Sequence, residues 1–485
     1  MPATPERTEP ALGNQPQRRL TLLDTTSIIV GIIIGSTIFK SSPLISASAA
    51  GWMTWALQQT LGWPGPDDTN GLMQAQYLGI ALIWLIGGVI ALLGALCYAE
   101  LATALPHEGG NYVFLTTAFG RPTGFAFAWA EFWIVRPGNI GAIAFVMATF
   151  ALQLLPDSWR TALGARGETI LAVAAIALLT VINILGIQME RWTQNVLTAA
   201  KVLGLLFVAL TAWCFLVPPV AISAPQPPNF LLPLGIIFVM FAYGGWSDMS
   251  YVAAEVANPQ KNITRALLLG TTAVTVIYLL LNLGFVHGLG LAGVYESKSI
   301  ASDVLHSAWG PIGDRAISLL VVVSCLGTIH GMLFTGARVF YKLGSEHWLF
   351  RWLGAWDAHR AVPLNSLLAQ AVATIALVMI FGANAQAFDR LVVFTGPFYW
   401  GFICLVIIAL AVLRQRGQLS ADRYRVPLYP LPPILFVLAC VYMCYAGIKY
   451  AWTEGTEEGY WSLGVVVVGA IVVAVDFVAG GKPRA

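Results

Sequence analysis

Long apolar stretches recur along the whole chain and determine its predicted secondary structure. Twelve of them have the length and the apolar character of membrane-crossing helices. They lie at residues 24–49, 75–105, 122–154, 168–187, 192–217, 230–256, 263–289, 313–343, 363–382, 388–413, 427–450 and 460–479. No large polar domain separates them, so the sequence predicts an all-α polytopic membrane protein with 12 transmembrane helices.

Two of these segments contain residues that interrupt an apolar helix. The first segment carries Gly35-Ser36-Thr37, and the sixth carries Phe241-Ala-Tyr-Gly-Gly-Trp246. Glycine weakens a helix, and Ser and Thr hydroxyls compete for its backbone hydrogen bonds. Irregular backbone at membrane depth is tolerated only where it lines a cavity, so the pair of breaks predicts a ligand site. The alternative for Gly35 is that it only permits close helix packing.

The positions of the breaks predict an internal repeat. Each break falls in the first helix of a set of five, and an odd number of crossings puts the second set in the opposite orientation. We therefore expect a 5+5 inverted repeat with broken helices 1 and 6. The expected division is a tail at 1–23, repeats at 24–217 and 218–413, and helices 11 and 12 with the C-terminus at 414–485.

Composition narrows the class of protein further. Of the 485 residues 58% are hydrophobic and 10% are charged, and the net charge of +2 gives no indication of a nucleic-acid partner. The six cysteines all lie in apolar segments without metal-ligand spacing, so neither a metal nor another cofactor is expected. The sequence also lacks a nucleophile–base pair, a zinc-protease motif and a nucleotide motif, so we do not expect an enzyme.

The distribution of Lys and Arg predicts the orientation. Sixteen of them lie in tails and loops on the side of the N-terminus, against five in the opposite loops. Positive residues concentrate in the cytoplasm, so both termini are expected there, with the protein in the plasma (inner) membrane.

The ends of the broken helices indicate the ligand chemistry. Unpaired N–H groups at a helix start favour an anion, and unpaired carbonyls at a helix end favour a cation. The expected N–H donors are those of Gly35, Ser36 and Thr37. The expected acceptors are carbonyls near Ile32 and Ile33 and in the second break, at Phe241, Ala242 and Gly244. One anionic and one cationic pole side by side favour a zwitterion, and the natural candidate is an α-amino acid.

Four further residues in the apolar segments have open interpretations. Lys201 lies well inside the fifth segment, where a lysine is costly and faces a cavity or a partner. It either replaces a coupling sodium ion, or loses its proton and couples transport to protons, or extends to the cytosolic interface. Phe241 either caps the site from outside or only packs. Glu131 and Arg136 share the third segment, where either they pair through neighbours or one of them lines the permeation path.

Several ordered motifs resemble the amino acid–polyamine–organocation (APC) superfamily, and within it the L-type amino acid transporter branch. Gly31-Ile-Ile-Ile-Gly-Ser-Thr-Ile-Phe39 is similar to the Gly-Ser-Gly-Ile-Phe signature of the superfamily. The other motifs are Ala95-Leu-Cys-Tyr-Ala-Glu-Leu101, Glu108-Gly-Gly-Asn-Tyr112, Ile134-Val-Arg-Pro137, Phe241-Ala-Tyr-Gly-Gly-Trp246, Glu255-Val-Ala-Asn-Pro259 and Leu333-Phe-Thr-Gly-Ala-Arg338.

The resemblance implies a LeuT-type fold and sodium-independent amino acid transport by alternating access, commonly exchange. Proton-coupled symport of amino acids or amines is the alternative. The resemblance also implies that the backbone at Gly35, Ser36 and Thr37 holds the substrate carboxylate. The amino group would be held by carbonyls of Ile33 and of the second break, where we include Phe241, Ala242, Tyr243 and Gly244 in the site. Phe241 matches the outer gate, and Lys201 matches a lysine that stands in for a sodium ion.

The chain departs from this family pattern at two places. Thr37 replaces the second glycine of the signature, which either trims the pocket or adds a hydroxyl donor. Animal members use a cysteine in the loop after segment 3 to bond an ancillary glycoprotein, and residues 155–167 contain none. We therefore expect no disulfide-linked ancillary subunit.

Overall fold

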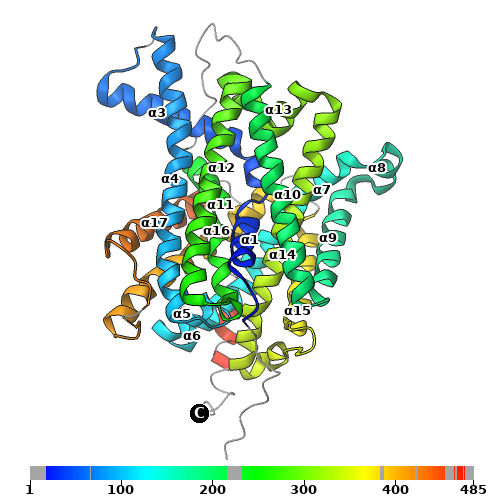
Figure 1. Cartoon of the computed structure of the whole chain (residues 1–485), viewed down its shortest axis with the longest axis vertical. Coiled ribbons are helices and arrows are strands. Elements are labelled where there is room, and N and C mark those ends of the chain that lie inside the picture. Colours follow the sequence, from blue (N-terminus) through cyan, green and yellow to red (C-terminus); the bar gives the residue numbers. More distant parts are fainter. Residues whose placement is uncertain are drawn as a thin grey trace, which may run out of the picture.

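A computed structural model describes residues 18–65, 67–215, 232–382, 387–420, 423–453, 464, 467–472 and 474–475. Regular structure in these residues is helical, and β-pairing is limited to two isolated bridges. The long helices run roughly side by side in one bundle (Figure 1). The predicted all-α fold is confirmed.

Eleven helical segments of the described residues are long and apolar enough to cross a membrane. They are Leu22–Lys40, Thr69–Ala104, Arg121–Leu154, Asp157–Ile184, Ile187–Cys214, Leu232–Glu255, Pro259–Glu296, Pro311–Glu346, Leu364–Phe381, Arg390–Gln415 and Leu431–Lys449. Each overlaps one of the first eleven predicted segments. The twelfth predicted segment, 460–479, falls largely outside the described residues, so the count of twelve stays a prediction.

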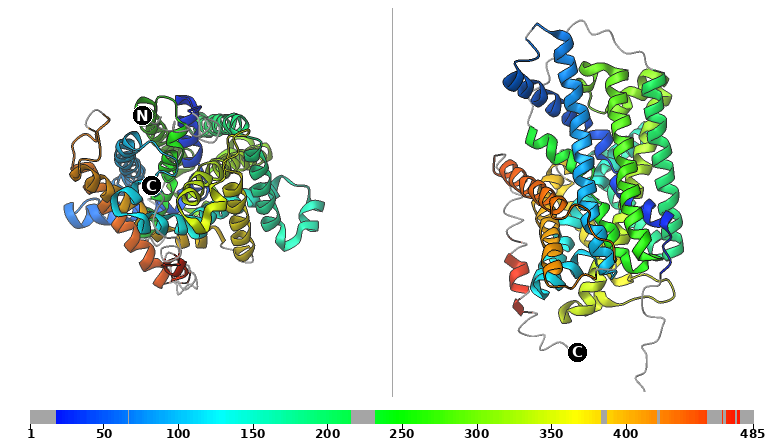
Figure 2. Two further views of the ribbon diagram at one scale, coloured as in Figure 1. Left: turned by 90° about the horizontal axis from the view of Figure 1, so that it is seen from below. Right: turned by 60° about the vertical axis from the view of Figure 1, so that its left-hand side comes forward.

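The helices that build these spans are named as in Figure 1. The long helices are α4 (Thr69–Ala104), α9 (Gly167–Ile184), α10 (Ile187–Cys214), α12 (Pro259–Glu296), α14 (Pro311–Glu346), α15 (Leu364–Phe381), α16 (Ala387–Gln415) and α17 (Leu431–Thr453). Of these, α12 is kinked at Gly290, whose φ is +68°. Helices outside or at the ends of the spans are α3 (Ser42–Leu61), α5 (Asn111–Phe119), α8 (Asp157–Leu163), α13 (Ile300–Trp309) and the 3₁₀ turns Gly164–Arg166 and Trp348–Gly354. The two further views show α3 and α17 lying obliquely to the main bundle (Figure 2).

The first span is broken at the predicted position. Its first half is α1 (Leu22–Ile33), and Thr21 is the N-cap residue. The Thr21 hydroxyl accepts from the N–H of Asp24, while the Asp24 carboxylate accepts from the Thr21 N–H. This reciprocal pair caps the helix start. The helix ends at Ile33, and a short helix, α2 (Thr37–Lys40), resumes after the Gly-Ser pair.

The sixth span is broken at the other predicted position. It consists of α11 (Leu232–Ala242), an irregular turn, and a 3₁₀ segment at Trp246–Glu255. The α1 half packs against this 3₁₀ segment, whereas α11 packs against α2 and α3. The first half of each broken span therefore contacts the second half of the other, as two antiparallel broken helices do. This arrangement agrees with the LeuT-type architecture.

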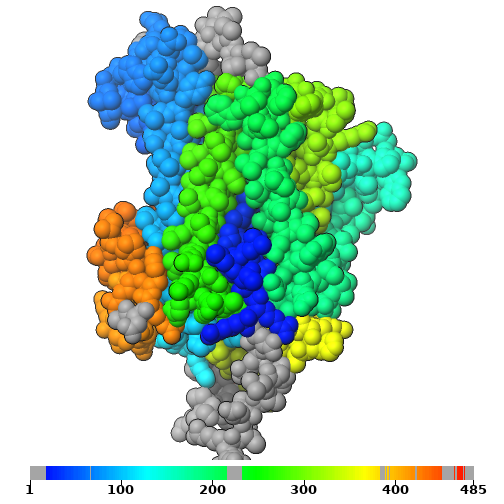
Figure 3. Space-filling view, viewed as in Figure 1, coloured from blue at the N-terminus to red at the C-terminus, as the bar shows by residue number. Residues whose placement is uncertain are grey.

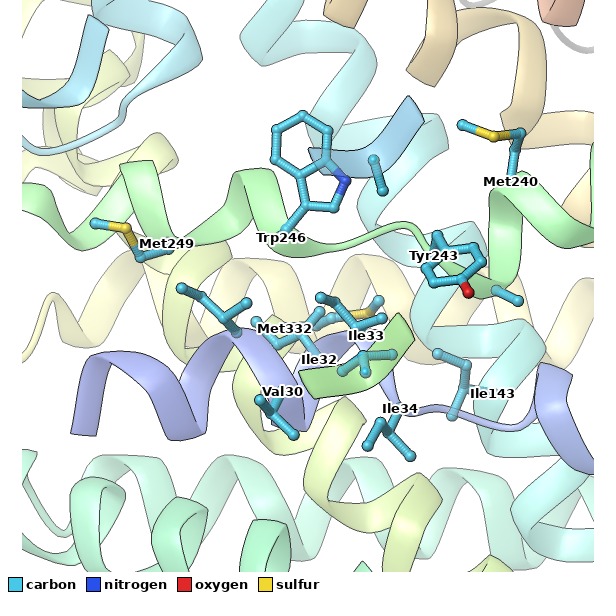
Figure 4. Close-up of a cluster of buried hydrophobic side chains, with 14 of the residues drawn as sticks. Val30, Ile32, Ile33, Ile34, Ile143, Met240, Tyr243, Trp246, Met249 and Met332 are labelled. Carbon is cyan, nitrogen blue, oxygen red and sulfur yellow. The ribbon is translucent and has the colours of Figure 1, made fainter. Parts of the chain in front are cut away.

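The broken first span lies in the middle of the bundle. In the space-filling view α1 emerges in dark blue between the green surfaces of its neighbours, and it packs against α10, α12 and α14 (Figure 3). Around the break, side chains of Ile32, Ile33 and Ile34 lie among Tyr243, Trp246, Met240 and Met332 from the facing elements (Figure 4). Apolar packing thus encloses the irregular backbone on several sides.

Candidate functional site: a cavity between two helix breaks

One small cavity, of about 50 Å³, lies between the two breaks. Both breaks and the middle of the third and tenth spans contribute to its walls. The lining residues are Ile32, Ile33, Gly35, Ser36, Thr37, Glu131, Val135, Arg136, Asn139, Ile143, Phe241, Gly244, Gly245, Asp248, Met332, Thr395, Gly396, Tyr399 and Trp400. The cavity therefore unites residues from distant parts of the sequence around interrupted backbone.

The first break offers free backbone donors to this cavity. The N–H of Gly35 is used, because it donates to the Ile33 carbonyl at 2.8 Å. Within the described residues, the N–H groups of Ser36 and Thr37 have no hydrogen-bond acceptor, and the buried Ser36 hydroxyl has no partner either. Buried N–H groups are almost always paired in proteins. Their orphan state at a cavity wall therefore marks a place where a ligand can accept hydrogen bonds.

The carbonyls of the two breaks are joined by a residue that the sequence analysis did not single out. The Tyr278 hydroxyl lies 3.2 Å from the Ile33 carbonyl oxygen and 3.3 Å from that of Ala242. One hydroxyl proton is shared between two acceptors, so the lone pairs of these carbonyls are only partly satisfied. Tyr278 thus holds the two breaks together, beside the cavity.

The remaining residues of the second break have different surroundings. The Phe241 carbonyl accepts from the Gly244 N–H at 3.1 Å, and Phe241 and Gly244 both line the cavity. Ala242 and Tyr243 do not line it, and the Tyr243 hydroxyl donates to the Trp84 carbonyl at 2.8 Å. The structure therefore brings six of the eight predicted substrate residues to the cavity, Ile33, Gly35, Ser36, Thr37, Phe241 and Gly244, and places two behind it.

Glycines at the breaks serve different purposes. A Cβ on Gly245, whose φ is +100°, would lie 2.5 Å from Ile32 Cγ2, so that position needs glycine for both conformation and space. A Cβ on Gly35 would come no closer than 3.7 Å to its nearest neighbour, Thr328 Oγ1, which is ordinary contact. Close packing therefore does not require glycine at position 35.

Lys201 is completely buried, with its ammonium against the first break. Its Nζ donates to the carbonyls of Gly31 (2.7 Å), Ile34 (2.8 Å) and Ser324 (2.8 Å), and Thr328 Oγ1 lies at 3.2 Å. Among the described residues no carboxylate contacts this ammonium. The side chain does not extend to an interface. A cage of neutral oxygens around one positive charge is also the environment that a bound alkali cation would have.

A second buried ionic cluster forms one wall of the cavity. The third span contains a π-helical stretch at Glu131–Val135, in which the Arg136 N–H donates to the Glu131 carbonyl five residues earlier. Arg136 Nε donates to Glu131 Oε1 at 2.9 Å, and its NH1 group pairs with Asp248 Oδ2. The two residues thus both pair with each other and line the cavity.

The broken spans make different contacts on the two sides of the breaks. On one side Phe241 packs edge-to-face on Phe388, and the Lys40 ammonium lies over the Phe388 ring at 4.1 Å. On the other side buried Arg338 pairs with Glu255 at 2.9 Å and with Glu190 at 3.3 Å. That ion cluster adjoins the start of α1, because the Leu20 N–H donates to the Glu255 carbonyl.

Sequence reasoning missed part of the site. Asp248, Tyr399, Asn139 and Thr395 line the cavity, and Tyr278 bridges the breaks, yet none was a candidate. Asp248 had a usable signal, since it is an acid within a predicted membrane segment two residues after the broken stretch. The others are ordinary helix residues whose facing depends on the packing.

Paired broken helices around a cavity within a bundle of apolar spans are typical of a secondary transporter of the LeuT type. The chain belongs to the amino acid permease family, whose model matches residues 20–472, and it is an APC-superfamily integral membrane protein. It is 27% identical over 456 residues to the mouse b(0,+)-type amino acid transporter 1, covering 90% of this chain and 84% of that protein.

Two human proteins are similar to the same degree. The large neutral amino acids transporter small subunit 2 is 27% identical over 493 residues, covering 99% of this chain and 84% of the relative. The cystine/glutamate transporter is 27% identical over 449 residues, covering 90% and 83%. These relatives agree with the L-type resemblance, and they are transporters.

Proposed function

We propose that this protein is a sodium-independent transporter that moves L-α-amino acids by alternating access, as an exchanger. The observation that carries the proposal is the cavity between the two breaks, with unpaired N–H groups of Ser36 and Thr37 on its wall. Family membership and relatives whose names describe amino acid transport support amino acids as the substrate class.

In this proposal the first break binds the substrate carboxylate. The N–H groups of Ser36 and Thr37 are the donors, and the Thr37 side chain stands at the cavity wall where the family signature has glycine. The substrate ammonium is assigned to the carbonyl side of the breaks, with Ile33, Phe241 and Gly244 at the cavity and Ala242 behind them. The backbone bends at Gly35, between the two poles.

Lys201 supports independence from sodium. Its ammonium already fills the oxygen cage made by the first break and α14. A fixed positive charge at this point stabilises the break without a bound ion, so no sodium gradient is required. If the change between outward-open and inward-open states occurs only when a substrate occupies the cavity between the breaks, the transporter works as an exchanger.

Proton-coupled symport is the second candidate, and one observation favours it. The Lys201 ammonium is buried among neutral oxygens, without a carboxylate partner in the described residues. A buried lysine in such surroundings can lose its proton. In that case the lysine would carry a proton during each transport cycle.

Alternating access requires that the two closures open in turn. We assign Phe241, with Phe388, to the outer gate and the Arg338–Glu190–Glu255 cluster to the cytosolic closure. The excess of Lys and Arg in loops on the N-terminal side supports cytoplasmic termini in a plasma membrane. We also propose that residues 24–217 and 218–413 form the two inverted repeats. The protein works without a disulfide-linked subunit in this proposal.

Counterflow in proteoliposomes tests the proposal. Vesicles loaded with unlabelled amino acids receive labelled alanine, serine, leucine or lysine in sodium-free buffer. Exchange predicts accumulation of label only in loaded vesicles. Uptake into empty vesicles that depends on an imposed pH gradient would favour the symporter, and binding without any flux would contradict both.

A further inference from the structure

The cavity wall carries more negative than positive charge. Arg136 is the only Lys or Arg among the described lining residues, and it faces two carboxylates, Glu131 and Asp248. All three side chains are buried, with exposures of 4% for Arg136, 2% for Glu131 and 4% for Asp248. With every group ionised the cluster has one surplus negative charge, and a buried unpaired charge is unfavourable.

The hydrogen bonds show where this surplus lies. Arg136 binds Oε1 of Glu131 and Oδ2 of Asp248, and the Thr335 hydroxyl also donates to Oδ2 at 3.2 Å. The second oxygens, Glu131 Oε2 and Asp248 Oδ1, receive no donor from the described residues. Two buried carboxylates that line a cavity, each with a free oxygen, form an acceptor site for a cation.

The other charged and ionisable groups nearby do not neutralise this site. The Arg136 guanidinium lies over the Tyr251 ring at 5.4 Å, and the Tyr399 hydroxyl at the cavity contacts Gly245 N–H and Ser247 at 3.4 Å. The Lys201 ammonium is engaged by carbonyls behind the first break and does not line the cavity. No second Lys or Arg of the described lining residues completes the cluster, and the cavity is where a positive group of a ligand reaches it.

We propose that Glu131 and Asp248, held by Arg136, form a subsite for a positively charged substrate side chain, an ammonium or a guanidinium. This rests on the proposed amino acid transport. The break backbone holds the α-carboxylate and α-ammonium, which are separated by a single carbon. The cluster stands on other elements, the π-helical stretch and the 3₁₀ segment, and so meets the far end of the substrate. An acidic side chain would be repelled by the same oxygens.

The first test uses the unmodified protein and two amino acids that differ by one charged group. Lysine and norleucine have the same carbon chain, but norleucine lacks the terminal ammonium. In counterflow at neutral pH the subsite predicts a KM for lysine roughly ten- to a hundred-fold below that for norleucine, as expected for charge-assisted hydrogen bonds. Alanine, which is too short to reach the cluster, serves as the reference substrate.

A charge series then tests the residues themselves. Asp248→Asn and Glu131→Gln each remove the surplus charge, and the double variant leaves Arg136 without a carboxylate. The preference for lysine over norleucine should fall to within a factor of about two in each single variant. The double variant should accept glutamate. Glu100→Gln, which removes a buried carboxylate paired with Arg414 outside the cavity, is the matched control and should retain the preference for lysine.

The alternatives predict different results. If the carboxylates held the α-ammonium, Asp248→Asn would raise the KM of alanine and lysine equally, which would overturn the side-chain assignment. Equal KM values for lysine and norleucine in the unmodified protein, with proton uptake accompanying norleucine, would overturn it in favour of a proton site. Failure of every amino acid to exchange would instead contradict the proposed function.

Discussion

The protein holds two buried ionic sites beside its cavity, and they differ in completeness. Around Lys201 one positive charge meets neutral oxygens, three of which lie within 2.8 Å. Around Arg136 one positive charge meets two carboxylates, and two of their oxygens lack a donor in the described part of the chain. In the first site the protein itself supplies hydrogen-bond partners for the charged group, whereas in the second site two carboxylate oxygens are left without a donor.

This difference suggests that the two ionic sites have different roles. The Lys201 site is made by backbone carbonyls of the break, so its charge fixes the shape of α1 at the point where the helix ends. The Arg136 site is made by side chains on the cavity wall, so an added positive group changes its charge balance. We infer that the first site maintains the break, whereas the second responds to the ligand.

The largest effect is expected from removing the cation of the incomplete site. Arg136→Met leaves Glu131 and Asp248 as two buried carboxylates without a counter-charge. Breaking a buried ion pair in this way typically costs about 3–5 kcal/mol. We expect a strongly lowered apparent Tm of the purified protein in detergent, measured by the loss of monodisperse protein after heating.

The control for this experiment is an exposed ion pair. Arg160→Met removes the partner of Asp157, whose side chains are 47% and 92% exposed, and such pairs contribute roughly 0–1 kcal/mol. Equal thermal stability of the two variants would contradict a buried, mutually dependent cluster.

The next effect in size concerns the Lys201 site. Lys201→Ala removes the charged donor from the carbonyls of Gly31, Ile34 and Ser324 and leaves them the Thr328 hydroxyl. A hydrogen bond from a charged group contributes about 1.5–3 kcal/mol, and the Thr328 hydroxyl replaces part of what is lost, so we expect exchange to fall more than ten-fold. Counterflow rates normalised to the amount of inserted protein measure this.

Lys261→Ala, at the start of α12, is the matched lysine control and should leave exchange unchanged. Unchanged exchange in the Lys201 variant would contradict its role. Two measurements on the Lys201→Ala variant distinguish the roles proposed for this lysine. Partial recovery of exchange in sodium buffer would support the role of Lys201 as a replacement for a sodium ion. Loss of the response of uptake to a pH gradient would support its role as a proton carrier.

The sequence predicted the parts of this molecule that depend on local composition. Apolar length located the first eleven spans, and Gly35-Ser36-Thr37 and Gly244-Gly245 located both breaks. Helix interruption is a local property, because it depends on the residue types within one or two turns. The amino-acid sequence alone was therefore sufficient to identify the residues at the breaks as candidates for the site.

The sequence could not predict which helix faces meet. Tyr278 bridges the breaks from a regular stretch of α12, and Asp248 meets Arg136 across 112 positions of sequence. Whether Glu131 and Arg136 pair depends on a π-helical turn that their apolar surroundings do not reveal. Such contacts are set by packing and rotation of whole helices, for which a single chain gives no direct signal.

The smallest effect is expected at Phe241, which belongs to the cavity wall and contacts neither ionic site. Its ring packs on Phe388 at 6.3 Å between centroids, and an aromatic pair contributes about 0.5–1.5 kcal/mol. Phe241→Ala should therefore raise the KM for exchange by roughly two- to ten-fold, with the apparent Tm little changed. Phe238→Ala, which removes another ring stacked near Phe388 but outside the cavity lining, is the matched control. A normal KM and no leak of preloaded substrate in the Phe241 variant would mean that this ring only packs and that the outer closure lies elsewhere.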